Sequence, residues 1–187
     1  MSEDTVHFSK TSLWGVVVAA VTLIALGVLT WYVATTPARE EVNTDAAATL
    51  HDSEDTPYSF LDGSTFEFSS VRGQVRVVNV WASWNPTSAQ ELIQLDELAA
   101  DFSARPVAFI AVNRKEPRSR IEAYLNQQPT FDNLTIIIDE TDAYYEAVSG
   151  YAMPETRIYD KEGNLHSTIR GPFDAGDIRA IIESLTQ

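Results

Sequence analysis

The feature that most limits how this chain can fold is a set of three short runs rich in β-branched residues, which are separated by two amphipathic stretches. The runs are Val75 to Trp81, Val107 to Asn113 and Leu134 to Asp139, and each has the length and composition of a buried strand. Between them, Pro86 to Phe102 and Pro117 to Gln127 carry apolar residues at helical spacing. This βαβαβ order predicts parallel strands joined by crossover helices.

The last third of the chain predicts a different connection. We expect a short helix over Asp142 to Ser149, and then a hairpin whose strands, Glu155 to Asp160 and Leu165 to Arg170, flank a glycine-containing turn. A final helix is expected from Asp174. Because hairpin strands run antiparallel, the complete pattern predicts an α/β fold with a central mixed sheet flanked by helices over residues 58–187.

An uncharged run of 21 residues, Leu13 to Val33, precedes this domain. As a helix it would be about 30 Å long, which matches the hydrocarbon core of a bilayer. Trp14, Trp31 and Tyr32 lie where interfacial aromatic residues are usual. The run predicts a single N-terminal transmembrane helix with residues 1–12 on the cytoplasmic side, and a cleaved signal peptide is the alternative.

Residues 34–57 contain six acidic residues, one arginine and no apolar periodicity. This composition predicts a solvated, flexible tether, in which the single His51 is expected to be solvated rather than to bind a metal. The whole chain has a net charge of −14. Nucleic acid is therefore not expected as a partner, because contact with phosphates requires a basic face.

The chain contains no cysteine. This absence excludes disulfides, zinc–thiolate sites, iron–sulfur clusters and every mechanism that uses a thiol. Asp139, Glu140 and Asp142 could be taken for a metal cluster, but acids between a strand and a helix usually cap the helix. We therefore expect neither a metal nor a cofactor.

The turn after the first strand is where chemistry would be expected. Asn85 suits the N-cap of the following helix, and Pro86 suits its first position. A helix N-terminus beyond a buried strand can stabilise an anion or lower the pKa of a thiol. Because no thiol is present, these two residues could also do no more than start the helix.

Two segments carry a family resemblance. Residues 81–88, WASWNPTS, resemble the WxxWCPxC segment of membrane-anchored thioredoxin-like proteins, the TlpA, ResA and DsbE/CcmG group, and the two family cysteines fall on Asn85 and Ser88. Residues 150–156, GYAMPET, are similar to the GxxxPET segment of the DsbE/CcmG branch. The resemblance implies a thioredoxin-like fold in which Pro154 is cis and faces the active helix.

Family members reduce disulfides, often in cytochrome c maturation, with the cysteine pair that this chain lacks. No catalytic residue is therefore expected. The resemblance implies a redox-inactive module on the bacterial inner membrane, with its C-terminal domain on the periplasmic side, that binds a cysteine-containing polypeptide or a redox-protein partner. Its groove would consist of Trp84, Asn85, Pro86, Thr87, Ser88, Tyr151, Met153, Pro154 and Glu155.

Two residues depart from the family pattern or lose their family role. Glu155 falls on the carboxylate of the PET segment, and without a thiol to tune we expect it to act in recognition. Arg157 stands where the family usually has an apolar residue, so it is expected to be exposed or paired with an acid.

Three alternatives remain open. Ser88 could be the nucleophile of a hydrolase, although no histidine lies near either motif and His166 is expected at the surface. The chain could be a family reductase whose cysteines have been substituted. It could also be a structural subunit that braces a membrane complex through its N-terminal helix.

Overall fold

The computed structural model describes residues 18–21 and 56–187. The chain divides into two units, Met1–Glu41 and Val42–Gln187, and the sheet belongs to the second. The predicted anchor, 13–33, lies outside the described residues except for 18–21, which are helical, and the predicted tether lies outside them except for its last two residues. Both stay predictions. Within the described ranges, no helix is both long and apolar enough to cross a membrane.

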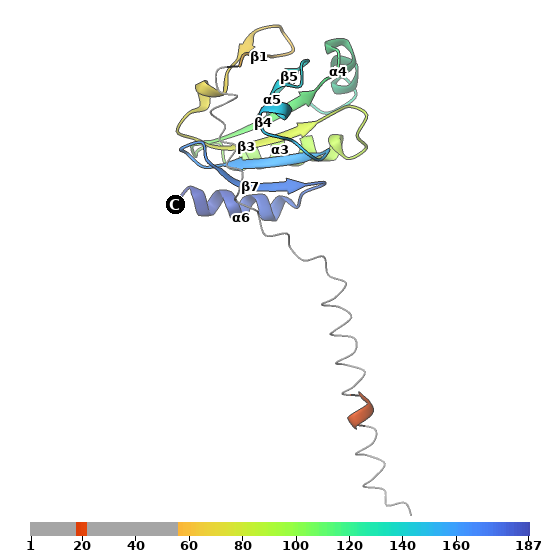
Figure 1. Cartoon of the computed structure of the whole chain (residues 1–187), viewed down its shortest axis with the longest axis vertical. Helices are drawn as coiled ribbons and strands as arrows, with labels where there is room; N and C mark the ends of the chain where they lie inside the picture. The colour runs from red at the N-terminus through yellow and green to blue at the C-terminus, as the bar shows by residue number, and fades with distance from the viewer. Residues whose placement is uncertain (1–17, 22–55) are drawn as a thin grey trace, which may run out of the picture. The chain divides into compact units, whose positions relative to one another are not determined.

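A seven-stranded mixed sheet with the order β2-β1-β5-β4-β3-β6-β7 forms the centre of the second unit (Figure 1). The three β-branched runs form β3 (Val75–Trp81), β4 (Val107–Arg114) and β5 (Thr135–Asp139), which are parallel, as predicted. The predicted hairpin is also confirmed, because β6 (Glu155–Tyr159) pairs antiparallel with β7 (Leu165–Arg170).

Four α-helices accompany this sheet in residues 56–187, and each corresponds to a predicted helix. They are α3 (Ser88–Asp101), α4 (Arg118–Leu125), α5 (Ala143–Ala147) and α6 (Ala175–Leu185). Asp174 is the N-cap of α6, and its Oδ1 accepts a hydrogen bond from the N–H of Gly176 at 2.7 Å. The final helix therefore begins where its capping residue predicts.

The strands bury side chains on both faces of the sheet, since successive strand residues point in opposite directions. Val77 of β3 belongs to a core cluster with Leu92 of α3 and Ile178 of α6, whereas Val78 belongs to a second cluster with Tyr144 of α5. α3 and α6 contact each other. Helices thus cover both faces, which is the thioredoxin-like α/β arrangement implied by the resemblance.

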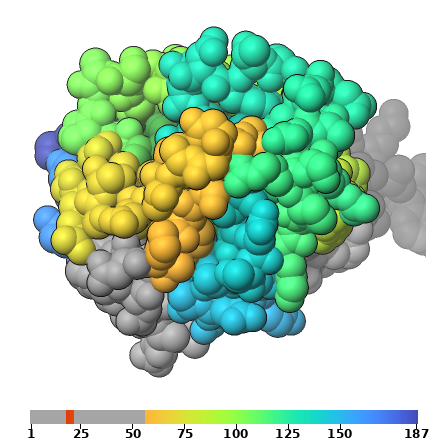
Figure 2. Space-filling view, turned by 90° about the horizontal axis from the view of Figure 1, so that it is seen from above, coloured from red at the N-terminus to blue at the C-terminus, as the bar shows by residue number. Residues whose placement is uncertain are grey.

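The segment before β3 contains elements that the sequence does not predict. β1 (Tyr58–Ser59), β2 (Thr65–Phe66) and a 3-10 helix, η1 (Phe68–Val71), are too short to show a period. Their aromatic rings, Tyr58, Phe66 and Phe68, are buried and pack edge to face. In Figure 2 the orange segment that contains β1 packs between the yellow residues that follow it and the cyan segment that contains α5.

Candidate functional site

Antiparallel pairing of β3 and β6 brings the two family motifs together. Val80 lies opposite Glu155, so the chain leaves β3 and enters β6 at the same edge of the sheet. We call this the motif edge and define it by residues 81–88 and 150–156. The buried carboxylates of the described residues all lie at or just below the ends of the strands on this side: Glu91, Glu116, Asp139, Asp142 and Glu155.

Asn85, at the first family cysteine position, closes the turn between β3 and α3. Its Oδ1 accepts hydrogen bonds from the N–H and the hydroxyl of Thr87, both at 2.9 Å, and its carbonyl oxygen accepts from the N–H of Ser88 at 3.2 Å. α3 begins at Ser88 with Thr87 as N-cap. The prediction that Asn85 caps a helix starting at Pro86 is wrong, because the asparagine side chain closes a tight turn first.

Ser88, at the second cysteine position, is completely buried. Its hydroxyl donates a hydrogen bond to the carbonyl oxygen of Ala82 at 2.9 Å. His166 is exposed on β7, and no histidine of the described residues hydrogen-bonds to Ser88. A serine nucleophile needs a base and access to substrate, so this geometry disfavours the hydrolase alternative.

The loop before β6 has the conformation that the resemblance implies. The Met153–Pro154 peptide bond is cis, and the carbonyl oxygen of Pro154 accepts a hydrogen bond from the N–H of Gly171 at 2.9 Å. The backbone N–H and C=O of Met153 make no hydrogen bond to any residue in the described part of the chain. These two groups can therefore pair with an added extended chain.

The predicted groove residues differ widely in exposure. Trp84 is 61% and Tyr151 83% exposed, and they are the large apolar side chains exposed in residues 56–187. Pro86 is also exposed, whereas Thr87 and Met153 are half-buried. The remaining four, Asn85, Ser88, Pro154 and Glu155, are buried. The accessible surface of the motif edge is thus apolar and mainly aromatic.

Glu155 holds the proline loop through hydrogen bonds from the buried side of that loop. Its Oε2 accepts hydrogen bonds from the N–H groups of Tyr151 and Ala152, each at 3.1 Å, and its Oε1 accepts from Nε of Arg157 at 2.7 Å. Glu155 is completely buried, so its expected role in recognition stays a prediction and would have to act through this loop rather than by contact with a ligand. Arg157 is buried and paired with an acid, which is one of its two expected environments.

The pKa of Arg157 lies above its ordinary value although the residue is buried. Burial disfavours the charged guanidinium, but the neighbouring Tyr159 and Glu155 favour it more strongly. The hydroxyl of Tyr159 in turn lies 3.0 Å from the hydroxyl of Tyr144 on α5. A buried polar network therefore joins the proline loop to α5.

Glu91 is a buried acid that sequence analysis missed. It lies in the first turn of α3, where its carboxylate accepts hydrogen bonds from Nδ2 of Asn79 at 3.1 Å and from the hydroxyl of Thr87 at 3.4 Å. Burial raises the pKa of Glu91, although both hydrogen bonds act in the opposite direction. The available signal was its spacing from Ser88 and Leu95, which places an acid on the inward face of α3.

Glu116, after β4, is a second acid that the sequence did not single out. Its carboxylate accepts hydrogen bonds from the N–H and the hydroxyl of Ser83, both at 2.6 Å, and from Nδ2 of Asn113 at 2.9 Å. Ser83 directly precedes the exposed Trp84. Glu116 thus supports the β3–α3 loop as Glu155 supports the proline loop.

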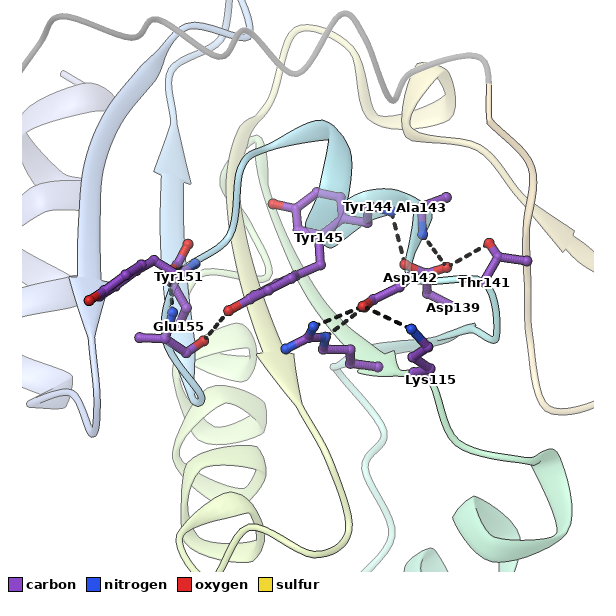
Figure 3. Close-up of polar contacts among 11 residues, drawn as sticks. Lys115, Asp139, Thr141, Asp142, Ala143, Tyr144, Tyr145, Tyr151 and Glu155 are labelled. Carbon is purple, nitrogen blue, oxygen red and sulfur yellow. Dashed lines mark hydrogen bonds and ion pairs between the residues drawn. The ribbon is translucent and has the colours of Figure 1, made fainter.

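Of the three acids predicted to cap a helix, Asp139 caps α5, Asp142 makes no side-chain cap bond, and Glu140 is exposed. Asp139 accepts hydrogen bonds from the N–H groups of Ala143 and Tyr144, and Asp142 forms a bidentate ion pair with Arg114 (Figure 3). This ion pair raises the pKa of Arg114. No metal-binding group of acids or histidines occurs among residues 18–21 and 56–187.

Tyr145 connects this ion pair to the proline loop. The Arg114 guanidinium stacks on the Tyr145 ring at 3.6 Å, and the Tyr145 hydroxyl donates a hydrogen bond to the carbonyl oxygen of Ala152 at 3.1 Å. In Figure 3, Tyr145 lies between Asp142 and the segment that carries Tyr151 and Glu155. A Cβ at Gly150 would lie 2.2 Å from this ring, so only glycine fits there.

Comparison with known proteins decides the family. The Redoxin family model matches residues 45–184, which is most of the chain. The chain belongs to the Redoxin family. Among its Redoxin relatives, the thiol-disulfide oxidoreductase ResA of Geobacillus thermodenitrificans is 27% identical over 127 residues, which cover 68% of this chain and 72% of ResA.

Two DsbE proteins also resemble this Redoxin chain. The thiol:disulfide interchange protein DsbE of Allochromatium vinosum is 36% identical over 104 residues, 55% of each protein. The crystal structure of a DsbE from Chlorobium tepidum has a TM-score of 0.66 at 20% identity, and the match covers 73% of this chain and 96% of that structure. The second likeness supports the fold alone.

The names of these relatives describe thiol–disulfide exchange, which this chain cannot perform because it has no cysteine thiol. Exchange requires a thiolate that attacks a disulfide and a second thiol that resolves the intermediate. At the two corresponding positions, the Asn85 amide closes a turn and the Ser88 hydroxyl bonds to the backbone. Both side chains keep the shape of the turn and neither supplies the reaction.

Proposed function

We propose that this protein is a redox-inactive Redoxin protein that binds extended segments of cysteine-containing polypeptides, or a redox-protein partner, at the motif edge. The observation that carries the proposal is the exposure of Trp84 and Tyr151 on the two loops of that edge. Large aromatic side chains in water forgo the free energy of burial, and exposed apolar patches usually mark interaction sites. Aromatic residues are also enriched at protein interfaces.

The backbone of the proline loop supports the same proposal. The unpaired N–H and C=O of Met153 lie two residues after Tyr151 in the same loop, so main-chain hydrogen bonds and apolar contacts are available to one ligand. Peptide recognition by strand addition uses this combination, in which the backbone supplies affinity and the side-chain contacts supply selectivity. Such binding needs no sulfur on the protein.

The proposed location rests on the N-terminal sequence. The uncharged run from Leu13 to Val33 has the length of a transmembrane helix. We place the domain on the periplasmic side of a bacterial inner membrane, held by this single anchor. A pathway of envelope thiol–disulfide exchange or cytochrome c maturation would supply partners there.

Site-specific crosslinking tests this function. A photocrosslinking residue is placed at Trp84 in the full-length protein in its native membrane, and a second variant carries it at Glu183, which is exposed on α6. The captured proteins are identified by mass spectrometry. We expect cysteine-bearing extracytoplasmic polypeptides from position 84 and none of them from position 183.

Two results would contradict the proposal. Equal capture from both positions would mean that the motif edge has no selectivity. Capture only from a crosslinker at Thr22 or Leu26, within the predicted anchor, would instead support a structural subunit that contacts its complex through the membrane helix.

A further inference from the structure

Each of the two exposed aromatic residues is attached to a buried carboxylate through its own loop. Glu116 accepts hydrogen bonds from the N–H and the hydroxyl of Ser83, the residue before Trp84, at 2.6 Å each. Glu155 accepts from the N–H groups of Tyr151 and Ala152, at 3.1 Å each. The exposed fractions of the two acids are 3% and 0%.

A surface loop does not need a buried acid to satisfy its N–H groups, because water can do so. Burying a carboxylate is costly unless several donors pair with it. Here each acid has three donors, since Asn113 also donates to Glu116 and Arg157 to Glu155. The two loops that carry exposed aromatic rings are thereby fixed before any ligand arrives.

We propose that Glu116 and Glu155 are positioning residues that hold Trp84 and Tyr151, respectively, as a preorganised pair of rings for polypeptide binding. This inference rests on the proposed function for its ligand. A loop that is already fixed loses less conformational entropy on binding. Removing one acid should therefore weaken binding by about two- to tenfold.

The other end of the sheet provides a matched control. Oδ1 of Asp96, on α3, accepts hydrogen bonds from the N–H groups of two consecutive loop residues, Asn133 at 2.8 Å and Leu134 at 3.0 Å. This loop precedes β5 and so lies away from the motif edge, which is at the strand's opposite end. Asp96→Asn removes the negative charge from a comparable pair of backbone donors without touching either aromatic loop.

Ring mobility tests the positioning role separately from binding. The full-length protein in lipid nanodiscs is labelled with fluorotryptophan and fluorotyrosine, and the two ¹⁹F resonances are identified by their loss in Trp84→Phe and Tyr151→Phe. We expect Glu116→Gln to increase the mobility of Trp84 only and Glu155→Gln to increase that of Tyr151 only. Asp96→Asn should change neither, whereas a general loss of stability would move both resonances in all three variants.

Two further arms complete the experiment. Because Glu155→Gln leaves the buried Arg157 without its acid, the variant is also made together with Arg157→Leu. Affinity is measured by fluorescence anisotropy with a labelled decapeptide that has one central cysteine between leucines.

The outcomes separate the two proposals. Unchanged ring mobility in both glutamine variants, or mobility that rises equally in both rings, overturns the positioning role. If each glutamine variant increases the mobility of its own ring alone but peptide affinity does not fall, the link between positioning and binding is overturned. Selective mobility in a wild-type protein that does not bind the peptide supports the positioning role and counts against the proposed function.

Discussion

Two helices, α3 and α5, start at the same end of the sheet, each following a parallel strand, and their first turns are held in different ways. At α5, the carboxylate of Asp139 accepts hydrogen bonds from two backbone N–H groups, both at 2.9 Å. At α3, the neutral amide of Asn85 accepts from one, that of Thr87. The carboxylate in the first turn of α3, that of Glu91, accepts hydrogen bonds from side chains instead.

This difference separates the shape of the family site from its chemistry. A helix N-terminus favours a negative charge, and at α5 an aspartate supplies it. At α3 the family has a cysteine whose thiolate would use the same field. Asparagine keeps the turn closed with a side-chain oxygen and brings no charge, so the architecture persists without the reaction.

The largest expected effect comes from restoring the sulfurs at α3. Asn85→Cys combined with Ser88→Cys should give a reducible disulfide and disulfide reductase activity, where the wild type has none, because the helix N-terminus should lower the pKa of the introduced thiol. Insulin reduction and redox titration against glutathione measure both. Each single cysteine variant is a control, and a disulfide that forms without any reductase activity would show that the motif edge has diverged as well.

Removing Asp139 or Asn85, the side chains that hold the first turns of α5 and α3, should show which of them stabilises the folded protein more. Asp139→Ala leaves two N–H groups in a buried setting without an acceptor and should lower the free energy of unfolding by about 2 kcal/mol, whereas Asn85→Ala should lower it by about 1 kcal/mol. Urea denaturation followed by far-UV circular dichroism measures both. An equal or larger loss at Asn85 would contradict the comparison.

The buried acid of α3 predicts a pH dependence. Because burial raises the pKa of Glu91 in the folded protein above its value in the unfolded chain, the native state binds this proton more tightly. Its stabilising contribution is present at low pH and is lost as the pH rises through the folded-state pKa. Glu91→Gln removes this loss.

The measurement is the difference in unfolding free energy between Glu91→Gln and wild type, from pH 4 to pH 8. The free energy of unfolding of the variant should increase relative to that of wild type as the pH rises. Asn85→Ala, which changes no ionisable group, provides the control. A difference that is constant, or that favours wild type increasingly with pH, would rule out this account of Glu91.

The smallest expected effect comes from adding the charge that α3 lacks. Asn85→Asp should raise the free energy of unfolding at neutral pH by about 0.5 kcal/mol, because the carboxylate faces the helix N-terminus. The gain should depend only weakly on salt, because position 85 is buried and buried charges are screened much less than exposed ones. Thermal unfolding at low and high ionic strength measures it, and a loss of stability in low salt would mean that repulsion from Glu91 outweighs the helix field.

The sequence predicts the helices and strands that are long enough to show a regular pattern of apolar residues. β3, β4 and β5 follow from their β-branched runs, and the parallel order follows from the helices between them. β1 and β2 have two residues each, so no repeat exists to detect. The exact start of α3 depends on the two hydrogen bonds that the Asn85 side chain accepts from Thr87, which propensity does not encode.

The candidate site is predictable in its motifs and not in its supports. Trp84, Met153 and Pro154 are found from two short segments that resemble a family. Glu116 and Glu91 are missed because their partners are distant in sequence: Glu116 bonds to Ser83, 33 residues away, and Glu91 meets Asn79 across the core. Such contacts become visible only when the fold brings the strand ends together.

The bond from the Ser88 hydroxyl to the Ala82 carbonyl joins the first turn of α3 to the end of β3. A pair of cysteines at this place would alternate between a covalent link and two free thiols, and each form would hold a ligand differently. A hydrogen bond has no second chemical form. If the motif edge binds a polypeptide, this protein's own contacts to it are then the same in oxidising and reducing surroundings, and any redox dependence of the occupancy comes from the ligand.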